Sequence, residues 1–76
     1  MGEINKYIFK KQIEKLKQEL ESLKQELESL NNTQRELLNA GGDDLWVREE
    51  INMVREEINM VEEQIHELQD ELEEED

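Results

Sequence analysis

Two runs of apolar residues with heptad spacing constrain the fold of this chain more than any other feature of its sequence. In each half, apolar residues recur at alternating steps of three and four, and only Gln34 breaks the pattern. Such spacing places the side chains on one stripe of an α-helix, which packs against a second helix in a coiled coil. The first stripe holds Phe9, Ile13, Leu16, Leu20, Leu23, Leu27, Leu30 and Leu37, and the second holds Val47, Ile51, Val54, Ile58, Val61, Ile65, Leu68 and Leu72.

The segment between the two stripes carries signals for the end of one helix and the start of another. Gly41 and Gly42 favour a helix end, since glycine readily takes the left-handed conformation found there, and Asp43 and Asp44 are good caps for the next helix. The sequence therefore predicts one all-α domain over residues 1–76, an antiparallel coiled-coil hairpin with helices over about 3–38 and 44–74 and a turn over about 39–43. A single interrupted parallel coiled coil is the alternative, because two glycines cost about 2 kcal/mol in a helix without forbidding it.

The size of the chain favours self-association, and its composition lacks the residue patterns that catalysis needs. A domain of 76 residues supplies only about 3–5 kcal/mol of net stability from its own core, so we expect a homodimer that forms a four-helix bundle. The chain has no Cys, and His66 is its only His. No cluster of metal-ligand or nucleophile–base spacing is present, so we expect no cofactor, no metal and no enzymatic activity.

The charge is strongly negative and unevenly distributed. The net charge is −13, yet residues 1–40 hold equal numbers of acids and bases, and the excess lies entirely in residues 41–76. Direct nucleic-acid binding needs a free cluster of Lys and Arg, so this balance argues against it. There is no apolar run of about 18 residues and no signal-peptide pattern, which predicts a cytoplasmic or intracellular protein without a membrane partner.

Each stripe contains one heptad that is repeated letter for letter. Residues 17–23 (KQELESL) recur as residues 24–30, and residues 48–54 (REEINMV) recur as residues 55–61. In an antiparallel pairing the two duplicated blocks face each other. There they bring like charges together, Lys24 beside Arg55 and Glu26 beside Glu57. Outside the repeat, Lys17 meets the opposite charge of Glu62. We interpret the chain as an engineered hairpin lengthened by one heptad in each arm, with natural tandem duplication as the alternative.

A second, shorter apolar stripe lies outside the predicted core. Trp46, Met53 and Met60 recur every seven residues, and Ile8 takes the same heptad position in the first arm. The simplest interpretation is the contact of a homodimeric bundle, and the alternative is a docking surface for a different protein, with Trp as an anchor and adaptable Met. We therefore predict a non-enzymatic coiled-coil scaffold or protein-interaction module.

The acidic dipeptide at the turn supports a different functional hypothesis. The hairpin with Asp43 and Asp44 at its tip resembles the transcription factors whose acidic-tipped coiled-coil hairpins enter the secondary channel of RNA polymerase. The resemblance covers the architecture and this one dipeptide. It implies an acidic regulator or inhibitor that inserts into, or covers, a basic site on a larger enzyme such as a transcription complex. Helix capping explains both Asp residues without such a role.

Overall fold

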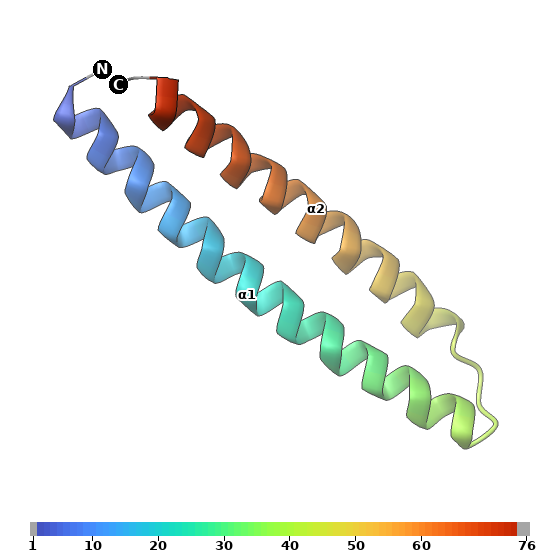
Figure 1. The fold of residues 1–76 in the computed structure, drawn as a ribbon. Coiled ribbons are helices and arrows are strands. Elements are labelled where there is room, and N and C mark those ends of the chain that lie inside the picture. The colour runs from blue at the N-terminus through green and yellow to red at the C-terminus, as the bar shows by residue number, and fades with distance from the viewer. Residues whose placement is uncertain (1, 75–76) are drawn as a thin grey trace.

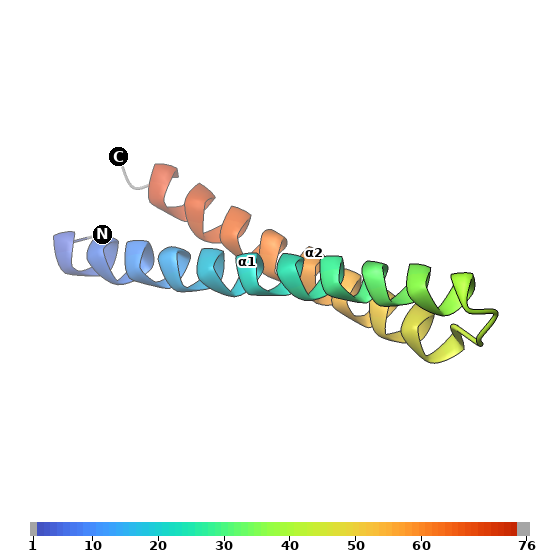
Figure 2. The same ribbon diagram turned by 90° about the horizontal axis from the view of Figure 1, so that it is seen from below.

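The computed structural model describes residues 2–74, which form two long helices and no strand. Helix α1 spans Glu3–Asn39, helix α2 spans Leu45–Glu74, and the short turn between them reverses the chain (Figure 1). The helix bounds lie within one residue of those expected from the sequence. The molecule is a narrow rod of 58 × 14 × 13 Å, in which α2 crosses α1 at a shallow angle (Figure 2). The helical hairpin expected from the heptad pattern is therefore confirmed.

The two apolar stripes form the seam between the helices, and the residues of α2 are the more deeply buried. Ile13 and Leu23 are the buried residues of α1, and the other apolar seam positions of that helix are half-buried. Val and Ile hold their methyl groups close to the backbone, whereas Leu reaches farther and covers the sides of the seam. In α2 six seam residues are at most 8% exposed: Val47, Ile51, Val54, Ile58, Val61 and Ile65. A single hairpin thus buries the α2 side of the seam and leaves the α1 side partly open to solvent.

The end of α1 is fixed by a glycine in the left-handed conformation. Gly41 has a φ of 76°, and its N–H donates to the carbonyl of Leu38 at 3.1 Å. The N–H of Gly42 donates to the carbonyl of Leu37 at 2.8 Å. These two bonds form a Schellman motif, which satisfies carbonyl groups that the helix leaves without a partner at its end. The sequence signal at the glycine pair is therefore realised as a true helix stop.

Contacts at both ends of the rod define how the helices are aligned. Near the turn, the Gln34 side chain donates to the Asp44 carboxylate at 3.0 Å, and at the open end Lys10 and Leu72 line the same shallow hollow. Both contacts match the antiparallel register expected from the sequence. Since α1 and α2 are unbroken between them, the two duplicated heptads lie opposite each other. Within residues 2–74, the expected ion pair between Lys17 and Glu62 is absent, because their charged atoms do not come within 4.0 Å of each other.

Candidate interaction surface

Four large apolar side chains remain exposed along α2 after the seam has formed. Leu45, the first residue of the helix, is 51% exposed, and the other three lie in a line. Trp46, Met53 and Met60 are 55%, 55% and 61% exposed. Their spacing of seven residues places them on one face of the helix, in a line about 21 Å long at 1.5 Å per residue. We call these three residues the Trp–Met stripe. The fold does not need the stripe, because a separate set of residues already fills the seam.

Ile8 does not extend the Trp–Met stripe, although it shares the heptad position of the three α2 residues. It is 45% exposed and lies on α1 near the open end of the rod. In the observed register Ile8 is level with residue 73 of α2. That is thirteen residues beyond Met60, or about 20 Å along the helix. The sequence grouped four residues as one candidate surface, and the structure brings together three of them.

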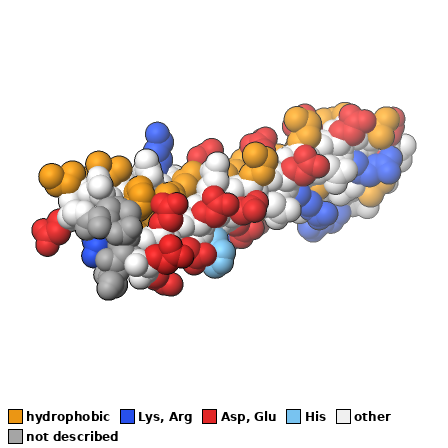
Figure 3. All heavy atoms as spheres, turned by 90° about the horizontal axis from the view of Figure 1, so that it is seen from above, with side chains coloured by type: hydrophobic (Ala, Val, Ile, Leu, Met, Phe, Trp, Pro, Cys, Tyr) orange, Lys and Arg blue, Asp and Glu red, His pale blue; other side chains and the backbone are white. Residues whose placement is uncertain are grey.

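Acidic side chains border the Trp–Met stripe on both sides. Glu49, Glu56 and Glu63 follow one side of the stripe, and Glu50 and Glu57 follow the other. All five are exposed, and we call them the acidic flank. Exposed hydrophobic groups alternate with acidic ones along the rod in Figure 3. The sequence shows the excess acid in the second half of the chain, and the heptad positions of these Glu residues are the signal that places them beside the stripe.

The two edges of the hairpin, where the helices meet solvent beside the seam, carry opposite charges. One edge is mostly basic, with Glu3 and Glu62 as its exceptions, and the other has acids and no base within residues 2–74. The basic edge consists of Lys10, Lys17, Lys24, Arg48 and Arg55, and the acidic edge of Glu19, Glu26, Glu50, Glu57 and Glu71, all of them exposed. The Trp–Met stripe borders the acidic edge, since its heptad position lies on that side of α2.

The two acidic residues at the turn have structural partners. Asp43 accepts a hydrogen bond from the N–H of Leu45 at 3.0 Å, which caps the start of α2. Asp44 accepts from Gln34, and its second oxygen lies 3.4 Å from Nε of Arg48, so that only 14% of its side chain is exposed. One carboxylate of the candidate tip therefore joins the two helices. In the sequence Gln34 is only a gap in the first apolar stripe, and its role as a partner of Asp44 is visible only in the structure.

The link between Gln34 and Asp44 leads to a prediction about the stability of the turn. In a double-mutant cycle of Gln34→Ala and Asp44→Ala, we expect a coupling energy of about 1–2 kcal/mol, as for a hydrogen bond to a partly buried charged group. Urea unfolding followed by circular dichroism measures it. Gln18→Ala combined with Asp44→Ala is the control, because Gln18 is exposed and distant, and should show no coupling. Additive effects in both cycles would mean that the bond contributes nothing to stability.

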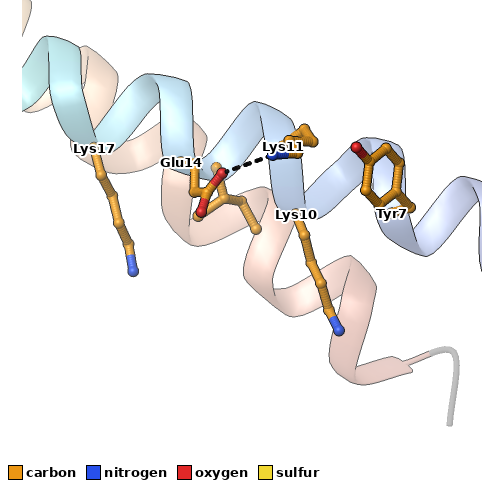
Figure 4. Close-up of a pocket in the computed structure, with 6 residues that line it drawn as sticks. Tyr7, Lys10, Lys11, Glu14 and Lys17 are labelled. Atoms are coloured by element: carbon orange, nitrogen blue, oxygen red, sulfur yellow. Dashed lines mark ion pairs between the residues drawn. The ribbon is translucent and has the colours of Figure 1, made fainter.

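A shallow hollow lies at the open end of the rod. It has a volume of about 390 Å³ and is lined by α1 residues, among them Tyr7, Lys10, Lys11 and Lys17 (Figure 4). The ammonium group of Lys11 is 3.5 Å from the Glu14 carboxylate and 5.7 Å from the centre of the Tyr7 ring. Lys10 and Lys17 point out from the helix in the same direction. Exposed lysines on one helix do not form a binding site by themselves.

Residues 2–74 contain no group of three or more His, Cys, Asp or Glu side chains placed to hold a metal ion. His66 is exposed and faces Asp70 one turn away on α2, at 3.9 Å. Neither helix, over the same residues, is long and apolar enough to cross a membrane. The sequence matches no protein-family model, no curated protein and no solved structure.

Proposed function

We propose that this hairpin is a non-enzymatic coiled-coil scaffold and protein-interaction module whose contact surface is the Trp–Met stripe. The proposal is supported by one observation above all, that three large apolar side chains of α2 stay exposed in a line while the seam residues are buried or half-buried between the helices. Contiguous exposed apolar surface marks interaction sites, and an amphipathic helix is one kind of partner that such a surface can dock. The homodimeric four-helix bundle expected from the sequence is one way in which the stripe could be covered, and it stays a prediction.

The proposal is tested by removing the stripe without disturbing the core. In the variant Met53→Ser/Met60→Ser, we expect the free energy of unfolding to change by less than about 1 kcal/mol, because both side chains are more than half exposed. Light scattering behind a sizing column, across a range of concentrations, then shows whether the unmodified chain forms a dimer and whether the variant loses it. A loss of about 2 kcal/mol or more in a monomer would contradict the proposal, since the stripe would then belong to the core.

The alternative role, an acidic regulator of a larger enzyme, draws less support from the described contacts. Its candidate contact residues are Asp43 and Asp44, and both accept hydrogen bonds within the hairpin itself. The variant Asp43→Asn/Asp44→Ser keeps capping side chains and removes both charges. If the hairpin acts through its tip, this variant should lose salt-sensitive inhibition of an enzyme such as RNA polymerase while staying folded. Equal inhibition by both proteins would rule out a role for the tip charges.

We also propose that the hairpin is an engineered form, lengthened by one heptad in each arm. The facing repeats support this, and deletion of residues 24–30 and 55–61 recreates the inferred parent of 62 residues. We expect this double deletion to fold as a hairpin whose length, 58 Å in the present chain, falls by about 10 Å. Small-angle X-ray scattering measures the change.

Single-arm deletions are the matched controls for this prediction. Each removes one heptad from one helix and leaves the end of the other helix without a facing partner, so the length should stay near that of the full hairpin. The extension hypothesis would be wrong if the double deletion failed to fold while either single deletion folded. In that case the repeated heptads would be essential to the fold and not an addition to it.

A further inference from the structure

The identity of the partner follows from the charge around the Trp–Met stripe. This inference rests on the proposed function, that the stripe is a contact surface. We infer that the stripe docks a basic amphipathic helix, with apolar residues at helical spacing and Lys or Arg on both sides of them. A second copy of this chain is disfavoured as the occupant. The argument uses the exposure of the stripe, its dimensions and the sign of the charge beside it.

The dimensions of the stripe suit a single helix of about fourteen residues. Its three anchors span about 21 Å, and their spacing of seven residues matches the repeat with which a helix presents one face to a neighbour. On the α1 side, Ser22 and Ser29 are exposed and lie level with Met60 and Met53 in the observed register. These small side chains leave room for a third helix to approach this edge of the hairpin.

The charge beside the stripe selects the partner. The acidic flank places five carboxylates along the α2 face that carries the stripe, and Glu19 and Glu26 of α1 face the same edge. The two Arg residues of α2, Arg48 and Arg55, lie on the opposite edge. A partner with Lys or Arg beside its apolar residues would find complementary charge along its whole length. An anionic membrane surface would be repelled for the same reason.

Electrostatic repulsion would oppose a homodimer through this face. Whichever direction a second copy takes, its own acidic flank would lie against the first, and ten carboxylates would meet around six apolar side chains. Like charges at neighbouring exposed positions oppose association, most strongly at low salt. The same stripe therefore favours a basic helix and discriminates against its own copy.

The test uses three synthetic peptides of 18 residues without Trp, so that Trp46 reports binding by fluorescence. The first has Leu at helical spacing on one face and Lys beside it, the second replaces each Lys with Glu, and the third scrambles the first so that no apolar face remains. We expect the first peptide to shift the Trp46 emission to the blue, with a Kd of about 10–100 μM for so small an interface, and to weaken as salt is raised. The other two should bind at least about tenfold more weakly.

Two variants assign this binding to the stripe and to its charge. Met53→Ser/Met60→Ser should weaken the first peptide by about tenfold or more. Glu50→Gln/Glu57→Gln should weaken it by about fivefold. Glu21→Gln/Glu28→Gln is the matched control, because it removes the same charge at the same spacing from an exposed face of α1 on the other side of the hairpin, and it should change Kd by less than about twofold.

The outcomes separate this inference from the function on which it rests. Equal binding of the scrambled peptide or of the Glu peptide would overturn the inference, because apolar spacing or charge would then not matter. If no peptide bound but the chain formed a dimer that Met53→Ser/Met60→Ser abolished, the inference would be wrong and the interaction module would stand. If no peptide bound and the chain stayed a monomer, the stripe would have no demonstrated partner and both proposals would fail.

Discussion

Replacing Ile58 with Asp is expected to unfold the hairpin. Ile58 is 8% exposed and belongs to the buried cluster between α1 and α2. Loss of a buried Ile side chain costs about 2–5 kcal/mol, and a charge placed in the same position finds no basic partner in the seam and adds to that cost. A domain of this size has only about 3–5 kcal/mol to lose. Circular dichroism at 25 °C should show most of the helical signal gone.

An exposed residue of the same helix supplies a control for this result. Met60 lies two residues beyond Ile58 and is 61% exposed, so Met60→Asp adds the same charge outside the seam. We expect it to change the free energy of unfolding by less than about 1 kcal/mol. If both variants unfolded equally, the charge added to an acidic helix would be the cause and the seam assignment would lose its support. If both stayed folded, Ile58 would not be a core residue.

The sequence was sufficient to predict the fold because one kind of signal dominates it. Heptad spacing indicated which residues of each helix face the partner, and all of those residues are buried or half-buried in the structure. The glycine pair and the following Asp residues indicated where the chain turns. These are local rules with strong physical causes, namely the helical repeat and the conformational freedom of glycine.

The candidate surface was harder to predict, since it depends on distances between helices. Shared heptad position grouped Ile8 with Met60, but heptad position gives only the face of a helix. The antiparallel register expected from the sequence already places Ile8 level with residue 73, about 20 Å beyond Met60. Likewise, Gln34 looked like a defect in the first stripe until the structure placed it beside Asp44. The contact between Gln34 and Asp44 depends on how the turn packs against α1, which heptad position does not give.

The glycine pair offers a second large effect, on the choice between a hairpin and an open rod. In the variant Gly41→Ala/Gly42→Ala, we expect a large fraction of the chain to form a continuous helix that pairs with a second copy. Gly41 has a φ of 76°, which costs Ala about 1 kcal/mol in the hairpin, while each Ala removes about 1 kcal/mol from the cost of a continuous helix. The total of about 3 kcal/mol moves the equilibrium by on the order of 100-fold.

Small-angle X-ray scattering across a concentration series distinguishes the two forms. A hairpin is 58 Å long, whereas a continuous helix through both arms would reach about 110 Å, and α1 of each chain would then pair with α2 of the other. Gly42→Ala alone is the control, since an added Cβ there meets only ordinary contacts at 3.4 Å or more and needs no left-handed backbone. It should favour the rod by only about fivefold. If the double variant kept the hairpin length at every concentration, the cap formed by Asp43 and the link between Asp44 and Gln34, and not the glycines, would be what holds the turn.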